Sequence, residues 1–256
     1  MATIQGTTGN DKVTVNSGDN YNAVEGDDDI TLMQWATTNP GKGNDTVRVI
    51  GGVVNEQATV QYWGAPGSIE VDLEAGYALD GHGTKDILIN VHNVHGFNRS
   101  GDKGYGSSES DFFWTGLPWQ SSGTTMIDGR GGTDTVTVGH KTSDGIGQIF
   151  LTISDGGQSA NFYFSNKPEY VFELKNIEVL RVRNWEINAN VEYDLKEMLG
   201  SSQSKSFLLK GDAAWANNFI DLSQAGPEFL LRGTQGWQTG VHGSSMNLTY
   251  SFMTQM

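Results

Sequence analysis

The sequence contains no cysteine, few prolines and few basic residues. Without cysteine among its 256 residues, the protein has no disulfide bond, no zinc–thiolate site and no thiol nucleophile. Only 5 residues are proline against 34 glycines, which excludes a proline-rich linker and indicates many tight turns. Lysine and arginine number 16 against 30 acidic residues, a net charge of -14, and so we expect no nucleic acid as a partner.

Long apolar runs and the motifs of common enzymes are also missing. No apolar run approaches the roughly 20 residues that span a bilayer, so we expect no membrane span. The N-terminal residues lack the basic and apolar regions of a cleaved secretion signal, so we expect any export to use another route. Gly-x-Ser-x-Gly elbows, P-loops and His-Glu-x-x-His helices are absent, which leaves no basis for serine hydrolases, nucleotide-binding enzymes or zincin proteases.

A short motif recurs in the first half of the chain: a glycine, an aspartate two residues later and an apolar residue two residues after that. It is present at Gly9-Asn10-Asp11-Lys12-Val13, Gly26-Asp27-Asp28-Asp29-Ile30 and Gly43-Asn44-Asp45-Thr46-Val47. The aspartates fall at positions 11, 28 and 45, so the spacing is 17 each time. This period suits a coil of two short strands and two turns. It predicts that the three aspartates lie above one another on one edge of a solenoid, with the apolar residues stacked inside.

Two further copies carry the resemblance to a known family. The clearer one is Asp128-Gly129-Arg130-Gly131-Gly132-Thr133-Asp134-Thr135-Val136, and the looser one is Asp80-Gly81-His82-Gly83-Thr84-Lys85-Asp86-Ile87-Leu88. In the first copy, Gly132, Asp134 and Val136 match three key positions of the nonapeptide Gly-Gly-x-Gly-x-Asp-x-U-x, where U is a large apolar residue. Over roughly residues 4 to 180, the chain thus resembles RTX (haemolysin-type) calcium-binding repeat proteins. Residues that replace a glycine of the pattern are Thr7, Pro40, Thr84 and Arg130.

The resemblance implies an all-β fold, a parallel β-roll or β-helix solenoid with calcium-binding turns. Glycine permits the positive φ of such turns, while aspartates and turn carbonyls supply the hard oxygen ligands that Ca²⁺ prefers. The alternative is that aspartate and glycine are only turn residues. The expected calcium ligands are Asp11, Asp28, Asp45, Asp86, Asp128 and Asp134, together with Gly9, Gly26 and Gly43 through their carbonyls.

Domain organisation follows from where the repeats end. We expect residues 1–180 to form the RTX-like solenoid and residues 181–256 a less regular, β-rich C-terminal cap or assembly region, with a single domain as the alternative. Alternating and β-branched residues predict strands at 58–62, 148–153 and 161–164. The best helix candidate is residues 193–199, which have an acidic start and are followed by Gly200.

One polar stretch contains the candidate catalytic residues. A histidine general base, an arginine that binds a carboxylate and a tyrosine acid would suit an epimerase or lyase acting on a uronic acid. The alternative is a polar loop, because no spacing here places these residues on a shared face. The candidates are His82, His92, His95, Arg99 and Tyr105.

Aromatic residues near the same stretch are candidates for ligand binding. Their flat rings could stack on sugar rings, whereas the alternative is ordinary packing inside a β-protein. The four candidates are Tyr62, Trp63, Trp114 and Trp119.

These features favour an extracellular or cell-surface protein that is not an enzyme. The leading hypothesis is a calcium-binding β-solenoid that acts as a surface, matrix or adhesive module and self-assembles into homo-oligomers or filaments. One alternative is an enzyme acting on an anionic polysaccharide, and another is a calcium-dependent carbohydrate-binding module. The resemblance also implies type I secretion through an uncleaved C-terminal signal. Calcium, a polysaccharide and a second copy of the chain are therefore the expected partners.

Overall fold

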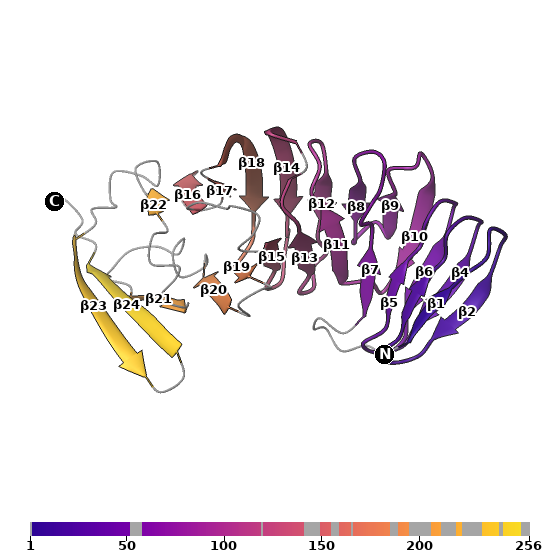
Figure 1. Ribbon diagram of the computed structural model, residues 1–256, viewed down its shortest axis with the longest axis horizontal. Helices are drawn as coiled ribbons and strands as arrows, with labels where there is room; N and C mark the ends of the chain where they lie inside the picture. Colours follow the sequence, from indigo (N-terminus) through magenta and orange to yellow (C-terminus); the bar gives the residue numbers. More distant parts are fainter. Residues whose placement is uncertain are drawn as a thin grey trace.

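The chain forms an all-β solenoid whose coils run side by side along its long axis (Figure 1). This computed structural model describes residues 2–51, 58–118, 120–140, 149–154, 159–164, 166–184, 189–194, 206–210, 219–221, 232–240 and 243–251. The structure confirms the expected fold class, since most neighbouring strands in the solenoid pair in parallel. Among the residues described, no helix is long and apolar enough to cross a membrane.

The described strands form two sheets, which we call sheet A and sheet B. Sheet A contains, in spatial order, β1 (Thr3–Gln5), β3 (Asn20–Asn22), β5 (Thr37–Asn39), β7 (Thr59–Gln61), β11 (Asn93–Phe97), β13 (Phe112–Thr115), β15 (Thr135–His140), β19 (Val179–Asn184), β20 (Ala189–Asp194), β21 (Ser206–Lys210), β24 (Gly243–Ser251) and β23 (Arg232–Gly240). Sheet B contains β2 (Lys12–Val15), β4 (Asp29–Leu32), β6 (Thr46–Val49), β10 (Lys85–Ile89), β9 (Tyr77–Leu79), β8 (Glu70–Asp72), β12 (Lys103–Tyr105), β14 (Ser122–Asp128), β18 (Lys167–Lys175), β17 (Ser159–Phe164), β16 (Ile149–Ser154) and β22 (Phe219–Asp221).

Each regular coil gives one strand to each sheet. The chain therefore turns from sheet A to sheet B at one edge of the solenoid, the first edge, and from sheet B back to sheet A at the other, the second edge. Residues 17 apart are direct neighbours, as in the pairs Val13 with Ile30 and Tyr21 with Thr38. The repeat period in the sequence is thus the length of one coil.

The core consists of inward-facing side chains stacked in columns. Strand β4 shows the alternation, because Ile30 and Leu32 are fully buried whereas Asp29 and Thr31 face outward. One column in sheet B joins the apolar residues of the repeats, as expected: Val13, Ile30, Val47 and Leu88. The longer column in sheet A joins Ile4, Tyr21, Thr38, Val60, Val94, Phe113, Val136 and Leu180.

One insertion interrupts the regular coils. After β7 the chain makes three strands in sheet B, where β9 pairs antiparallel with both β8 and β10. The coil then closes through β10 and β11. As a result, β12 pairs with β8 instead of with the strand of the preceding repeat. The turns that carry the repeated aspartates lie on the first edge before this insertion and on the second edge beyond it.

Beyond β15, antiparallel pairing becomes common. Strands β16, β17 and β18 form an antiparallel meander, and β19 pairs antiparallel with β20. The expected domain boundary at residue 180 falls inside β19. The helix expected at residues 193–199 is wrong at its start, because Tyr193 and Asp194 belong to β20. The rest of that segment lies outside the described residues.

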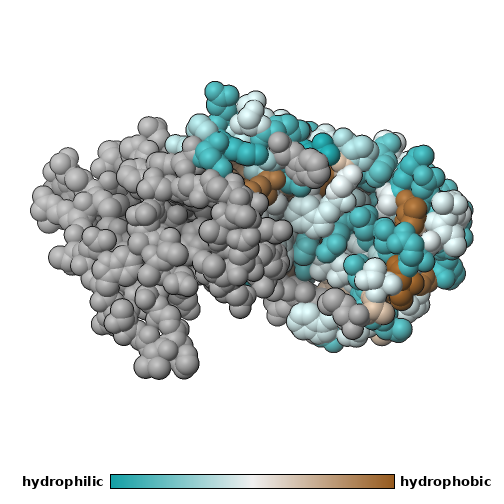
Figure 2. All heavy atoms as spheres, in the orientation of Figure 1, coloured by the Kyte–Doolittle hydropathy of each residue, from teal (hydrophilic) through white to brown (hydrophobic). Residues whose placement is uncertain are grey.

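Several large apolar side chains remain on the surface of the N-terminal coils, where Figure 2 shows hydrophobic residues among hydrophilic ones. Strands β1 and β2 end the two sheets, and each pairs with a neighbour on one side only. Ile4 of β1 stands at the end of its core column and is 37% exposed. The exposed apolar residues are Ile4, Met33, Trp35, Ile50, Leu79, Ile87 and Ile89.

Candidate functional site

The repeated aspartates form a hydrogen-bonded ladder along the first edge. Each backbone N–H donates to the carboxylate of the equivalent aspartate in the next coil. The Asp11 N–H donates to Asp28 Oδ1 at 2.7 Å, the Asp28 N–H to Asp45 Oδ1 at 2.8 Å, and the Asp45 N–H to Asp86 Oδ1 at 3.0 Å. These four residues form the first ladder. The stacking of Asp11, Asp28 and Asp45 confirms what the 17-residue period predicts, and Asp86, 41 residues after Asp45, extends the stack.

A second ladder runs along the opposite edge. The Asp111 N–H donates to Asp134 Oδ1 at 2.7 Å, and the Asp134 N–H donates to Glu178 Oε2 at 2.7 Å. Asp134 lies between β14 of sheet B and β15 of sheet A, whereas Asp11 lies between β1 of sheet A and β2 of sheet B. Asp111, Asp134 and Glu178, the second ladder, therefore occupy the second edge. The copy of the motif at Asp134 does not extend the stack begun by Asp11.

The second carboxylate oxygen of each ladder aspartate is either paired or left without a donor. Three have donors: Asp11 Oδ2 accepts from the Thr7 N–H at 2.8 Å, Asp86 Oδ2 from the Tyr62 hydroxyl at 2.8 Å, and Asp111 Oδ2 from the Ser107 N–H at 2.6 Å. Among the described residues, three other ladder oxygens are buried without a hydrogen-bond partner: Oδ2 of Asp28, Asp45 and Asp134.

Burial and mutual repulsion make these carboxylates hard to ionise. Burial, followed by the charges of neighbouring carboxylates, raises the pKa of Asp45 and of Asp134 to about 8. Burial raises the pKa of Asp86 to about 7, and it also raises that of Asp28. At neutral pH, stacked buried carboxylates therefore need either protons or a cation.

The oxygens around the ladders suit a hard cation. A Cβ placed on Gly129 would lie 2.4 Å from Asp134 Oδ2 and 2.3 Å from the Asn176 carbonyl oxygen, so a carboxylate and a carbonyl oxygen converge beside this glycine. Among the described residues, no group of three or more His, Asp or Glu side chains could hold a metal ion. A cation here would therefore take most of its ligands from backbone carbonyls, which Ca²⁺ accepts readily. The residues present fit Ca²⁺ provided that backbone carbonyls supply most of its ligands.

The glycines of the repeats allow the turns of the first edge to stack closely. A Cβ on Gly43 would lie 1.8 Å from the Gly26 carbonyl oxygen, and one on Gly26 would lie 2.7 Å from the Gly9 carbonyl oxygen. Any side chain at Gly26 or Gly43 would push the coils apart. The carbonyls of the repeated turns are thus brought next to one another on the edge that holds Asp28 and Asp45.

Asp128 has a different role from the ladder aspartates. Its Oδ1 accepts hydrogen bonds from the Arg130 N–H at 3.0 Å and from the Asn176 side-chain amide at 2.8 Å. It therefore supports the turn that contains Gly129. Arg130, which stands where the repeat pattern has glycine, has a φ of 64° and makes a bidentate ion pair with Asp72 at 2.7 and 2.8 Å.

The five candidate catalytic residues lie on different parts of the solenoid. His82 lies in the turn between β9 and β10, and Arg99 in the turn between β11 and β12. His92 lies on the second edge, where its Nδ1 is 2.8 Å from Asp111 Oδ1, and this contact raises the pKa of His92. His95 faces outward from sheet A and Tyr105 from sheet B. These positions do not form one catalytic group.

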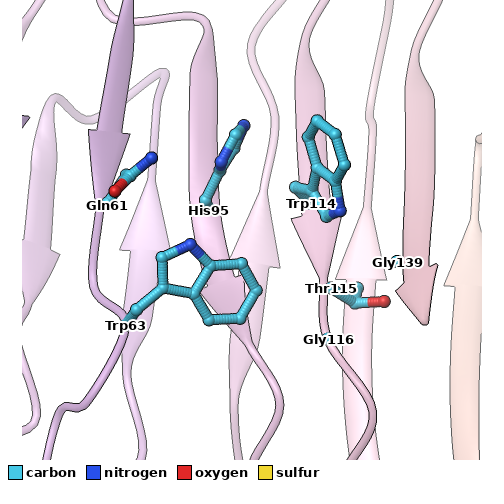
Figure 3. A pocket seen from close by; sticks show the side chains of 7 residues that line it. All are labelled: Gln61, Trp63, His95, Trp114, Thr115, Gly116 and Gly139. Carbon is cyan, nitrogen blue, oxygen red and sulfur yellow. The ribbon is translucent and has the colours of Figure 1, made fainter. Parts of the chain in front are cut away.

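Two of the four aromatic candidates meet on the outer face of sheet A. Trp63, His95 and Trp114 lie in a row, with ring centroids 6.3 Å apart for Trp63 and His95 and 4.7 Å apart for His95 and Trp114. Tyr62 instead points into the core, where its hydroxyl bonds Asp86, so it is not part of an exposed platform. Trp119 lies outside the described residues. The row borders a cavity, the aromatic pocket, lined by Gln61, Trp63, His95, Trp114, Thr115, Gly116 and Gly139 (Figure 3).

Asp111, Glu178 and Thr115 are among the residues of these sites that sequence reasoning missed. Asp111 follows Gly106 at the spacing by which Asp134 follows Gly129, and an apolar residue follows at the expected offset, so the signal was present without the central glycine. Glu178 replaces aspartate at the end of the second ladder and carries no motif. Thr115 becomes part of the pocket only through its place at the end of β13.

Comparison with known proteins adds no evidence of kinship. No protein-family model matches the chain, and no curated protein matches it in sequence.

Proposed function

We propose that the chain is a calcium-stabilised β-solenoid that acts outside the cell as a structural or adhesive module and performs no catalysis. The observation that carries this proposal is a set of buried carboxylate oxygens that have no donor in the described part of the chain, Oδ2 of Asp28, Asp45 and Asp134, at the same position of the repeated motif. A buried, unpaired anionic oxygen is costly unless a proton or a cation compensates it. The same kind of unpaired oxygen recurs in both ladders, which indicates that it belongs to the repeated structure of the solenoid.

A divalent cation explains the ladders better than protonation does. The chain carries a net charge of -14, so a bound cation would also relieve repulsion across the whole molecule. Asp28 and Asp45 would hold Ca²⁺ on the first edge with carbonyls of Gly9, Gly26 and Gly43. Asp134 and the Asn176 carbonyl would hold it on the second edge. Bound there, the ion would supply the positive charge that joins adjacent coils.

The type of ligand supports an extracellular location. Sites with few carboxylates and many carbonyls bind Ca²⁺ weakly, in the range of about 10⁻⁴ to 10⁻³ M that is typical of extracellular modules. Calcium at that concentration is available outside cells. The location also agrees with the RTX-type proteins that the repeats resemble.

The positions of the candidate catalytic residues favour this structural role over an epimerase or lyase. A general base and a general acid must both reach one substrate. His92 lies on the second edge, Arg99 on the first, and Tyr105 on the outer face of sheet B. In addition, the strongly acidic protein would repel an anionic polysaccharide.

Self-association is the second part of the proposal. Strands β1 and β2 stand last in their sheets among the described strands, and Ile4 of β1 is 37% exposed. Open ends of solenoids and sheet edges favour pairing between chains. We therefore expect calcium-loaded protein to form oligomers as its concentration rises.

The test is a calcium titration of EDTA-treated protein, followed by circular dichroism and light scattering. Calcium should raise the midpoint of thermal unfolding, because a ligand bound by the native state alone stabilises it. The double variant Asp45→Asn with Asp134→Asn should lose most of this response. Asp29→Asn, which removes a carboxylate paired with Lys12 and Arg48 on the outer face, should keep it. If calcium leaves the unfolding midpoint of the unaltered protein unchanged, the calcium proposal is refuted. If the particles grow without calcium, self-assembly does not depend on calcium.

A further inference from the structure

The aromatic pocket is not explained by the stability of the solenoid. In β7, β11 and β13, the residues that build the core are Val60, Val94 and Phe113, which are buried and in register with one another. The next residue in each strand points the other way. Gln61, His95 and Trp114 therefore form a matching row on the outer face of sheet A (Figure 3).

The shape of the pocket is set by Trp63. Its indole reaches across β11 toward the end of β13, where a Cβ on Gly116 would lie only 3.1 Å from the ring. Gly116 thus makes room for the indole. The resulting cavity has a volume of about 450 Å³, within the range of small-molecule sites in proteins. Strands β7 and β13 flank β11, so the aromatic row extends about 10 Å across the sheet.

Gln61 supplies a polar side chain that a ligand in the pocket can reach. It stands beside His95 on the outer face of sheet A, and its amide carries both donors and an acceptor. Thr115 also lines the pocket, but its side chain lies on the core side of sheet A, in register with the buried Phe97 and Val138.

The lining carries no charge at neutral pH. None of the seven lining residues is acidic, lysine or arginine. Burial lowers the pKa of His95 to about 3, so its imidazole is neutral. A phosphate or carboxylate on a ligand would find no cation here.

We propose that the aromatic pocket binds an uncharged segment of a glycan chain. The C–H faces of pyranose rings are apolar and slightly positive, which suits the negative faces of the indoles, and the ring hydroxyls would hydrogen-bond the Gln61 amide. The length of the row exceeds one sugar ring, so it suits a short oligosaccharide. This site goes beyond the structural role of the ladders and does not depend on calcium occupying them.

The experiment is a titration of the folded protein with defined oligosaccharides, followed by tryptophan fluorescence and calorimetry. The probes are cellohexaose, mannohexaose and chitohexaose, with hexagalacturonate as the charged comparison and a ten-proline peptide as a non-glycan ligand that also binds aromatic rows. At least one neutral hexasaccharide should bind at least about tenfold more tightly than hexagalacturonate and than its own monosaccharide. The proposal fails if no neutral probe saturates the signal, if hexagalacturonate binds equally well, or if the peptide alone binds.

Variants locate the binding. Gln61→Leu removes the amide while keeping a similar volume, and should weaken binding about three- to tenfold. Trp114→Ala should weaken binding about tenfold or more. Trp35→Ala is the matched control, because Trp35 is an exposed indole in a turn of the N-terminal coils. Equal affinity for the Gln61→Leu variant and the unaltered protein, with both folded by circular dichroism, would overturn the assigned role of this amide. Loss of binding in Trp35→Ala would place the site elsewhere.

Discussion

The backbone N–H of Asp28 donates a hydrogen bond of 2.8 Å to Oδ1 of Asp45, the equivalent residue one coil further along the solenoid. The other oxygen of the same carboxylate is buried and has no hydrogen-bond donor among the residues that the structure describes. One oxygen of Asp45 therefore links two coils, while the other has no described group beside it that compensates a negative charge. Because the two oxygens differ in this way, the link between coils and the effect of the charge can be tested separately.

Two substitutions at Asp45 separate the roles of its oxygens. Asp45→Asn keeps an oxygen for the Asp28 N–H and removes the charge, so we expect metal-free protein to be at least as stable as the unaltered chain. Asp45→Ala leaves that buried N–H without an acceptor, which should cost about 1–3 kcal/mol of unfolding free energy. Urea denaturation with EDTA measures both. Equal destabilisation by Asn and Ala would contradict the assignment.

The stability of metal-free protein should fall as pH rises. The pKa of Asp45 and of Asp134 is raised from the ordinary 3.8 to about 8, so the native state holds protons that the unfolded chain has lost. The contribution of these protons to stability is complete below about pH 4 and is lost as pH rises toward 8. Thermal unfolding in EDTA between pH 4 and 9 measures the trend. Added calcium should reduce it above pH 7, and an opposite slope in EDTA would contradict the raised pKa values.

Removal of the Tyr62 hydroxyl should weaken the first ladder. Tyr62 is buried, and its hydroxyl donates to Asp86 Oδ2 at 2.8 Å. Tyr62→Phe would leave that buried oxygen without a donor, at a cost of about 1–3 kcal/mol. Tyr21→Phe is the control, because Tyr21 donates at 3.1 Å to the more exposed Asp11. Denaturant unfolding in EDTA should show the smaller loss for Tyr21→Phe, and the reverse order would be inconsistent with the ladder.

Close stacking of the turns predicts strong intolerance of side chains at Gly43. The added Cβ of Gly43→Ala would lie 1.8 Å from the Gly26 carbonyl oxygen, so neighbouring coils must separate. We expect a loss of about 3 kcal/mol or more of unfolding free energy. Gly18→Ala meets no atom within 4 Å but has a φ of 81°, and should cost only about 1–2 kcal/mol. Equal losses at the two positions, measured by urea denaturation, would show that the turns can relax apart.

Much of the solenoid was predictable because its repeats are local. Gly26, Asp28 and Ile30 each occupy a fixed place in a coil, and their order in the sequence is their order in space. Strands such as β7, β16 and β17 were predictable from alternation and β-branched or aromatic residues. The helix expected from residue 193 failed at its start because β20 pairs antiparallel along the whole of the preceding strand β19, and this pairing overrides the local helix signal.

The candidate sites were predictable only in part. The stack of Asp11, Asp28 and Asp45 follows from the period alone. The position of Asp134 on the second edge does not, because it depends on the sheet to which each flanking strand belongs: β14 of sheet B precedes Asp134, whereas β1 of sheet A precedes Asp11. Trp63, His95 and Trp114 come together because of the register between β7, β11 and β13. These strands are irregularly spaced in the sequence, so their register could not be predicted.

By itself, the sequence determined the coil length, the inward direction of the apolar residues and the ladder of the first edge, because a repeat of constant length places like residues above one another. It also determined that no thiol chemistry takes place. Only the tertiary structure decided which oxygens are left without donors, which edge each carboxylate occupies and which aromatic residues meet. Those properties depend on contacts between side chains of different coils, and beyond the regular repeats the spacing in the sequence is too irregular to give the register of these coils.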